Sequence, residues 1–493
     1  MESVAQQRTV EKGIPKRRPR RWLRRLLLTL LAVVLLLVAA IIGVMLYFDI
    51  PSNAAGMAAK SVCSAAFVAG RDPDAATLME QDVLPASPAL SLVSTQVDAA
   101  QHTVTGEFLG LFDRRASLLD KRGCVLDTEP DPAAEPYVAA TPDPRPWPTG
   151  EAAVPEADWP RGVDAAALTG VVDAAFEGSG DPLAANARGV AVVQDGRLLV
   201  LRDGADVAPG TALHGWSMTK TVAGMLAYAK LTEDGIDLET PVVDVFPPDR
   251  EPSWVAQWRE DDRAEITVAD LVFMRPGLAV DEGYQPWEPV VQMLYGEPDM
   301  AGWAADHPTD SAPGTSWEYL SATSNILADV VKAQFATDEQ YWTHSKDALF
   351  DPIGLTSATL ETDTTGTWVG SSYLWASVTD WARLGQVMLD DGRWDGRQVL
   401  PPGWLDLAAT PAMPDGDGHG YGAQTWIPGD PIGGECKDTP GIPRDTLSME
   451  GHWGQLVAMI PSKNAVIVRL GWTFESDQFD ACRFISDVAA TLP

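Results

Sequence analysis

The chain has little of what a metal site needs. Its 493 residues include only four cysteines and six histidines. No Cys-x-x-Cys pair occurs, and the histidines are scattered without the spacing that metal ligands usually show. We therefore expect neither a metal ion nor another cofactor.

Basic residues are also scarce, since 36 Lys and Arg stand against 69 Asp and Glu, for a formal net charge of −33. The first 48 residues hold nine of the basic residues and two of the acidic ones, which leaves 27 basic and 67 acidic residues in the remainder. So acidic a remainder repels the phosphates of nucleic acid. Nucleic acid is therefore excluded as a partner, and the acidity itself indicates solubility rather than chemistry.

One uncharged apolar run, residues 26–48, is long enough to cross a bilayer as a helix. The basic segment 16–25 precedes it and would hold the N-terminus in the cytoplasm. A cleaved signal is the alternative, with Ala54-Ala55-Gly56 as a possible cleavage region, but its apolar core usually has about seven to fifteen residues. We predict an uncleaved single-pass anchor in the cytoplasmic (inner) membrane, with all that follows in the periplasm or its extracytoplasmic equivalent.

All four cysteines lie on the predicted exported side, where an oxidising compartment makes disulfides the default. Four cysteines allow three pairings. Pairing within each region of the chain favours Cys63 with Cys124 and Cys436 with Cys482.

Five regions follow from composition and pattern. Residues 1–25 are the cytoplasmic basic segment and 26–48 the anchor. Residues 53–127 contain helix and strand signals and predict a small α/β unit. Residues 128–162 are dense in proline and indicate an extended linker. Residues 163–493 form the large domain.

Within the large domain, strand pairs are expected near both ends, at 189–194 with 197–201 and at 456–460 with 465–470. The sequence between them is mostly helical, with long loops. We therefore predict an α+β fold, in which an antiparallel sheet built from the ends of the domain is flanked by helices and lies beside a helical subdomain. A cleft between the two parts is the natural place for a site.

The only Ser-x-x-Lys of the chain, Ser217 to Lys220, opens an apolar run that predicts a helix. Residues three apart share a helix face, so the amine of Lys220 can reach the hydroxyl of Ser217 and activate it as a nucleophile. The alternative is an ordinary helix start, in which Ser217 is the cap and Lys220 is solvated.

Two further segments fit such a site. Tyr319 precedes a helix expected to start near Ser324, and a neighbouring ammonium would lower the pKa of its phenol. The alternative is a half-buried aromatic in a loop. His452-Trp453-Gly454 lies at the start of a strand, where small residues let backbone amides approach a substrate oxygen.

In this order, Ser217-x-x-Lys220, Tyr319-x-Ser321 and His452-x-Gly454 resemble the three motifs of the serine β-lactamase and penicillin-binding-protein superfamily, above all its class C and esterase-like branch. Within that branch, residues 281–284 (Asp-Glu-Gly-Tyr) and 371–385 are similar to the aminohexanoate-dimer (nylon-oligomer) hydrolases. The resemblance implies a β-lactamase/transpeptidase-like fold.

The resemblance also implies the roles of particular residues. Catalysis would rest on Ser217, Lys220 and Tyr319, and the oxyanion would be held by the backbone N–H groups of Ser217 and Gln455. The substrate would be bound by a further set of residues. These are Tyr284, Ser321, His452, Trp453 and Gly454.

The implied function is hydrolysis of a small amide or ester through an acyl-enzyme. By this resemblance, His452 replaces the third-motif Lys of true β-lactamases, and Ser321 replaces their second-motif Asn. Efficient β-lactam hydrolysis is therefore not expected, because a neutral imidazole attracts a carboxylate less than an ammonium does. The alternatives are a cell-wall D-alanyl peptidase, a weak β-lactamase and a non-catalytic binding module. Four tryptophans near the motifs would line an apolar pocket or simply belong to the core. They are Trp216, Trp317, Trp375 and Trp453. Neither the physiological substrate nor the oligomeric state follows from the sequence.

Overall fold

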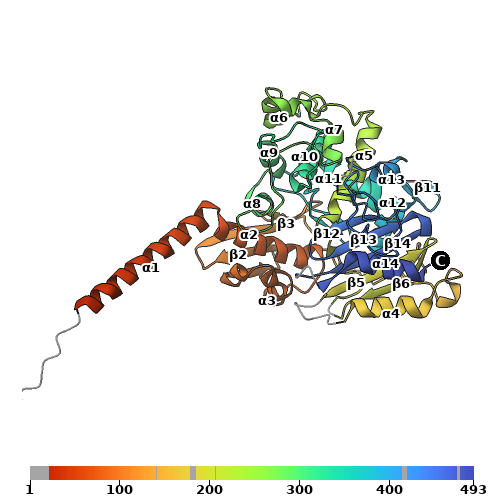
Figure 1. Ribbon diagram of the computed structural model, residues 1–493, viewed down its shortest axis with the longest axis horizontal. Helices are drawn as coiled ribbons and strands as arrows, with labels where there is room; N and C mark the ends of the chain where they lie inside the picture. The colour runs from red at the N-terminus through yellow and green to blue at the C-terminus, as the bar shows by residue number, and fades with distance from the viewer. Residues whose placement is uncertain (1–20, 140, 178–184, 206, 414–418, 475–477) are drawn as a thin grey trace, which may run out of the picture. The chain divides into compact units, whose positions relative to one another are not determined.

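The computed structural model describes residues 21–493, except for residues 140, 178–184, 206, 414–418 and 475–477. The chain divides into two compact units, Met1–Phe48 and Asp49–Pro493. In the first unit, helix α1 (Arg21–Tyr47) contains a 24-residue stretch with a mean hydropathy of 3.2 (Figure 1). A helix long and apolar enough to cross a membrane is thus present where the sequence predicted it, and a signal sequence near the N-terminus can meet the same criteria of length and composition.

The second unit begins with helices and a four-stranded antiparallel sheet in the order β1-β2-β3-β4, which we call the α2–β4 region (residues 50–126). The sequence indicated helix and strand signals in this region without giving the four strands, and the start of β3 carries charged residues that weaken its alternation. Helix α2 lies directly on the sheet. The two approach so closely that a Cβ at Gly106 of β2 would clash with the carbonyl of Ala55 in α2. The elements are α2 (Ile50–Cys63), η1 (Ser64–Val68), α3 (Ala75–Leu78), η2 (Met79–Val83), η3 (Leu84–Ala86), η4 (Pro88–Leu92), β1 (Val93–Asp98), β2 (Thr103–Phe108), β3 (Phe112–Leu119) and β4 (Gly123–Leu126).

Both disulfides have the pairing that the sequence favoured. Cys63, at the end of α2, is bonded to Cys124 in β4, with a Cα–Cα distance of 6.0 Å. Cys436 is bonded to Cys482 with a Cα–Cα distance of 5.3 Å.

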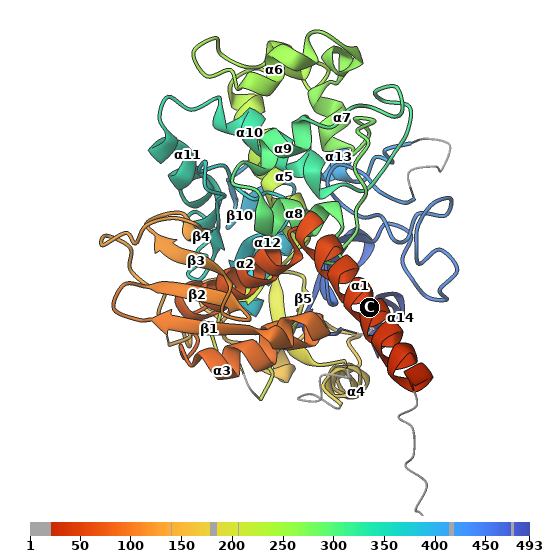
Figure 2. The same cartoon turned by 90° about the vertical axis from the view of Figure 1, so that its left-hand side faces the viewer.

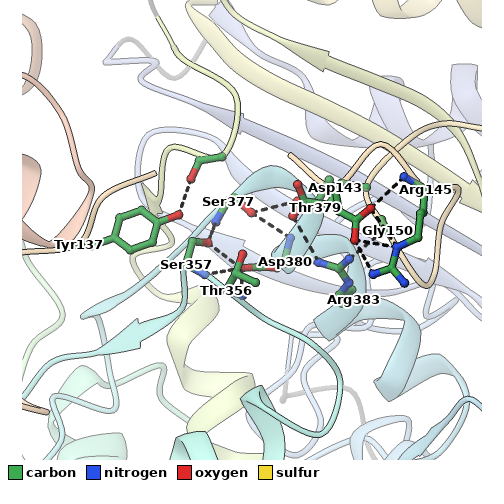
Figure 3. A network of polar contacts seen from close by, with 12 residues as sticks. Tyr137, Asp143, Arg145, Gly150, Thr356, Ser357, Ser377, Thr379, Asp380 and Arg383 are labelled. Carbon is green, nitrogen blue, oxygen red and sulfur yellow. Dashed lines mark hydrogen bonds and ion pairs between the residues drawn. The ribbon is translucent and has the colours of Figure 1, made fainter. Parts of the chain in front are cut away.

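Residues of the proline-rich segment 128–162 form hydrogen bonds with residues that come later in the chain (Figure 3). Arg383, on helix α12 (Val378–Leu389), donates to the Gly150 carbonyl at 2.9 Å and to the Asp380 carboxylate at 2.9 Å. The phenol of Tyr137 donates to the Gly210 carbonyl at 2.9 Å. The segment is therefore attached to the region that follows it, and its role as a domain boundary stays a proposal.

The main sheet of the molecule has five antiparallel strands in the order β12-β13-β14-β5-β6. It joins the two ends of the predicted large domain, because β14 pairs with β5, for example through Val468 and Ala191. The predicted antiparallel sheet is thus present. The strands are β5 (Ala187–Gln194), β6 (Arg197–Asp203), β12 (Leu447–Gly451), β13 (Gln455–Ile460) and β14 (Ala465–Gly471).

Both faces of this sheet are covered, which explains its continuous apolar strands. Alternate residues of β13 point to opposite faces: Leu456 and Ala458 join the cluster under the helices α4 (Ala165–Ala175) and α14 (Ala481–Thr491). Val457 and Met459 join the larger core shared with α12 and α5 (Met218–Glu233). Helix α5, which carries the Ser-x-x-Lys motif at its start, is therefore packed into the centre of the molecule.

Most of the remaining elements form the helical part, in which α6, α7, α9 and α10 group on the side of the second unit away from α4 (Figures 1 and 2). Its helices are α6 (Ser253–Trp258), α7 (Val268–Val272), α8 (Pro289–Gly296), α9 (Met300–Ala305), α10 (Ser321–Lys332), α11 (Asp338–Ser345) and α13 (Trp404–Ala408). Two small sheets complete the fold, β7 (Leu213–His214) with β9 (Leu374–Ala376) and β8 (Thr359–Leu360), and β10 (Arg393–Trp394) with β11 (Arg397–Gln398).

Candidate active site

The turn that leads into α5 places Ser217 at the helix N-terminus. Trp216, immediately before it, has a φ of 49°, a left-handed conformation that costs a bulky residue about 1–3 kcal/mol and that clusters at functional sites. Among the described residues, the Ser217 side chain has no capping hydrogen bond to the first turn of α5. The reading of Ser217 as a simple helix cap is therefore wrong, and its hydroxyl is available for other contacts.

Lys220 is buried directly beside Ser217. Its Nζ donates to Ser217 Oγ at 2.9 Å, to Ser321 Oγ at 3.0 Å and to the Ser371 carbonyl at 3.2 Å. Burial lowers the pKa of Lys220 from 10.5 to about 8, against the opposing effect of the Glu282 carboxylate. At pH 7, about one Lys220 in ten is then a neutral amine that can accept a proton. The alternative of a solvated lysine is wrong.

Tyr319 contacts the ammonium of Lys220 through the face of its aromatic ring. Lys220 Nζ is 4.6 Å from the ring centroid of Tyr319, and the ring stacks on Trp426 with centroids 5.1 Å apart. Burial and the negative charge of Glu282 raise the pKa of Tyr319 well above its usual value, while a hydrogen bond with Ser217 opposes the rise. The expected lowering of this pKa is therefore wrong, because burial and the nearby carboxylate outweigh a cation that faces the ring. Tyr319 stays a neutral phenol at neutral pH.

Glu282 is a member of this cluster to which the sequence analysis gave no role. Its carboxylate accepts from the Ser321 backbone N–H at 2.7 Å, from Ser321 Oγ at 2.6 Å and from the Tyr284 hydroxyl at 2.8 Å. A carboxylate is favourable at that point because Ser321 begins α10, three residues earlier than predicted, and helix N-termini attract negative charge. The Ser321 hydroxyl thus links Lys220 to Glu282, because it accepts from Lys220 Nζ and donates to the Glu282 carboxylate. Tyr284, a predicted site residue, joins this network through its own hydrogen bond to Glu282.

Replacing Glu282 by glutamine tests whether this carboxylate positions and tunes Lys220. The negative charge of Glu282 raises the pKa of Lys220, so Glu282→Gln is expected to lower the pH at which kcat/KM reaches half its maximum. The measurement is a pH profile of ester hydrolysis. Glu288→Gln, on the same loop, is the matched control and leaves the profile in place. An unchanged midpoint in Glu282→Gln would show that Glu282 does not act on the base.

The third segment lies in the turn between β12 and β13, where Trp453 has a φ of 62°. This turn abuts the nucleophile, because a Cβ at Gly451 would clash with the carbonyl of Gly215, two residues before Ser217. The His452 ring stacks on Tyr284, with centroids 4.6 Å apart and planes 13° apart. Burial lowers the pKa of His452 to about 4, so the imidazole is neutral at pH 7.

Gln455 holds this turn by its side chain. Its Nε2 donates to the His452 carbonyl at 3.1 Å and to the Gly471 carbonyl at 2.6 Å, and its Oε1 accepts from the Gly471 N–H at 3.0 Å. Gln455 is the first residue of β13 and follows Gly454 directly, and these bonds hold its side chain between the turn and β14. Its backbone N–H remains the predicted second oxyanion donor.

The four tryptophans divide between pocket and core. Trp216 and Trp453 line a cavity of 340 Å³ that also reaches Tyr284 and His452. Trp375 is buried against His214, with ring centroids 4.5 Å apart. The half-buried ring of Trp317 packs near Tyr421 and Trp426, beside Tyr319. In the part of the chain that the structure describes, no group of three or more His, Cys, Asp or Glu side chains could hold a metal ion.

Comparisons with known proteins agree with this architecture. The model of the family described as Beta-lactamase matches residues 172–489. A 6-aminohexanoate-dimer hydrolase of Paenarthrobacter ureafaciens is 25% identical over 281 residues, which are 52% of this chain and 64% of that enzyme, so the match spans less than two thirds of its length.

Two solved structures have the same fold. One is a candidate 6-aminohexanoate-dimer hydrolase from Bacillus anthracis, with a TM-score of 0.50 and 20% identity, covering 62% of this chain and 80% of that one. The other is a family VIII carboxylesterase, with a TM-score of 0.50 and 14% identity, covering 67% of this chain and 99% of that one. The predicted β-lactamase-like α+β fold is therefore confirmed.

Proposed function

This chain belongs to the beta-lactamase family, and we propose that it is a serine hydrolase that cleaves an amide or ester bond through an acyl-enzyme on Ser217. The observation that carries the proposal is the 2.9 Å contact between Ser217 Oγ and Lys220 Nζ, whose burial lowers the pKa of the amine to about 8. A hydroxyl beside a partly neutral amine is an activated nucleophile.

In the proposed acylation step, the neutral amine of Lys220 takes the proton of Ser217, and Ser217 Oγ forms a bond to the substrate carbonyl carbon. The resulting oxyanion accepts hydrogen bonds from the backbone N–H groups of Ser217 and Gln455. Each such donor is worth about 3 kcal/mol in the transition state. Trp216 supports this geometry because its left-handed conformation fixes the turn that presents Ser217.

In the second half of this step, the bond from the carbonyl carbon to the leaving amine or alcohol breaks, and the leaving group needs a proton. Tyr319 supplies it, since its raised pKa keeps it protonated, and the proton held by Lys220 then restores the phenol. Water attacks the Ser217 ester by the same proton transfers and releases the acid. Lys220 is thus the base, and Tyr319 acts mainly as the acid.

Small amides and esters are the proposed substrates, in keeping with the 6-aminohexanoate-dimer hydrolase to which the chain is similar. The neutral imidazole of His452 supports this choice over a β-lactam or a D-alanyl peptide, because it attracts a substrate carboxylate less than an ammonium would. We further propose that the enzyme is exported and held in the membrane by α1, with residues 1–25 in the cytoplasm.

One labelling experiment tests both parts of this proposal. Cells that express the full chain are treated with a fluorescent fluorophosphonate or a fluorescent penicillin, fractionated and separated by mass. We expect a strong fluorophosphonate label, weak penicillin label, and a full-length labelled protein in the membrane fraction. A strong penicillin label would favour a peptidase, no label with either probe would contradict the hydrolase, and a soluble protein starting near Gly56 would contradict the anchor.

A further inference from the structure

The 340 Å³ cavity begins at the nucleophile's own turn. Trp216, next to Ser217, forms one side of it, and the stacked rings of Tyr284 and His452 form another. Trp453 adds a third aromatic surface. The volume lies in the range of pockets that take small ligands. Ser217 is the chain neighbour of Trp216, so a group attached to a carbonyl at Ser217 lies next to this space.

Another part of the lining, which we call the α2 wall, comes from a distant part of the sequence. Ile50, Ala54 and Met57 lie one helical turn apart on one face of α2, and Leu90 comes from η4. These residues belong to the α2–β4 region, which lies outside the matched residues 172–489. The cavity is thus lined in part by a region of this chain that the family model does not cover.

Buried ion pairs tie the α2–β4 region to other parts of the second unit. On the same helix, Lys60 forms a buried ion pair with Glu361 at 2.5 Å. Asp82 of the same region pairs with Arg188 of β5 at 2.7 Å, and both side chains are buried. Breaking a buried pair by removing one partner usually costs about 3–5 kcal/mol, so these contacts keep the α2–β4 region in place.

The chemistry of the cavity selects for uncharged, mainly apolar groups. Its described lining is largely aliphatic and aromatic, and its uncharged polar side chains include Asn53, Ser87 and Gln285. Among the described residues that line it, none is Asp, Glu, Lys or Arg, and His452 is neutral at pH 7. The aliphatic side chains of the α2 wall line the same cavity as the aromatic rings next to Ser217. A carboxylate or ammonium would lose its hydration here without gaining an opposite charge.

The position of the proton-transfer groups indicates which half of the substrate enters. The described lining lies around Trp216, Tyr284 and His452 and includes none of Ser217, Lys220 and Tyr319. The Tyr319 ring stacks instead on Trp426, which is not among the described lining residues. Since the leaving group must reach Tyr319 for its proton, the cavity is left for the acyl half.

We propose that the α2–β4 region forms the wall of an acyl-chain pocket, and that this enzyme acts on esters or amides of uncharged, apolar, medium-length acyl groups. This inference rests on the proposed acyl-enzyme at Ser217. It gives the α2–β4 region a role in specificity, which its sequence did not indicate.

The test compares the full chain, purified in detergent, on p-nitrophenyl esters from acetate to dodecanoate. We expect kcat/KM to rise with acyl length by up to about fourfold for each buried CH₂, and to level off once the cavity is full. Ala54→Trp, which places an indole in the cavity, should lower the octanoate-to-acetate ratio of kcat/KM at least tenfold. Met57→Ala enlarges the same wall and should move the optimum to longer chains.

Ala99→Trp is the matched control, because Ala99 lies in the exposed turn between β1 and β2 of the same region, and the octanoate-to-acetate ratio should not change. Fluorophosphonate labelling reports on Ser217 independently of chain length. If the protein is labelled and turns over acetate, but kcat/KM does not depend on acyl length, the proposed acyl-chain pocket is wrong and the proposed serine hydrolase is still supported. A length dependence in alkyl acetates instead of p-nitrophenyl esters would assign the cavity to the leaving group and also overturn the proposal.

Discussion

Ser217→Ala is expected to abolish ester turnover and fluorophosphonate labelling while leaving the melting temperature close to that of the wild type. The loss follows because no other hydroxyl in the proposed mechanism can form the acyl-enzyme. Stability should change little because Ser217 Oγ caps no described turn of α5, and because Lys220 Nζ keeps its bonds to Ser321 Oγ and to the Ser371 carbonyl. Turnover of p-nitrophenyl acetate, labelling and thermal unfolding are the three measurements.

Ser94→Ala provides the control for Ser217→Ala, because Ser94 is an exposed serine of β1. Turnover and labelling should match the wild type. If the Ser217→Ala variant were still labelled by the fluorophosphonate, the nucleophile would be another residue and the proposed mechanism would be wrong. If it lost both activity and fold, the hydroxyl would have a structural role that its observed contacts do not indicate.

Lys220→Ala is expected to lower kcat/KM by at least about a hundredfold, the usual effect of removing a positioned acid–base group. In the wild type, only the neutral amine accepts the proton of Ser217, so kcat/KM should rise about tenfold for each pH unit below the pKa of about 8 and level off above it. In Lys220→Ala this rise should disappear, because the group that titrates is gone. Initial rates of ester hydrolysis between pH 5 and 9.5 check both statements.

Lys230→Ala is the matched control, since Lys230 lies on the same helix and its Nζ pairs with Asp234 at 2.7 Å, close to the end of α5. The rate and the pH profile should both stay close to those of the wild type. A pH profile of Lys220→Ala with the wild-type midpoint would assign the base to another group.

Much of the site could be predicted because its chemistry is local in the chain. Ser217 and Lys220 lie three residues apart on one helix, and this spacing alone predicts their contact. The disulfides Cys63–Cys124 and Cys436–Cys482 each close within a short stretch of chain, so proximity in sequence was enough to favour their pairing.

Glu282 shows where this approach stops. It contacts Ser321, 39 residues later in the chain, and no periodic pattern connects the two. Its effect on Lys220 and Tyr319 depends on distance and on burial. Only a three-dimensional arrangement sets these two quantities, which is why the pKa of Tyr319 moves opposite to the predicted direction.

The sequence by itself determined the apolar helix, the strand pairs at both ends of the large region and the order of the three motifs, because each depends on neighbouring residues or on a short repeat. The tertiary structure decided the rest. It brought Glu282 to Ser321, lowered the pKa of Lys220 by burying it, and placed Ala54, Met57 and Trp216 in the lining of one cavity. Contacts between distant segments arise from the packing of whole elements, and no local pattern encodes them.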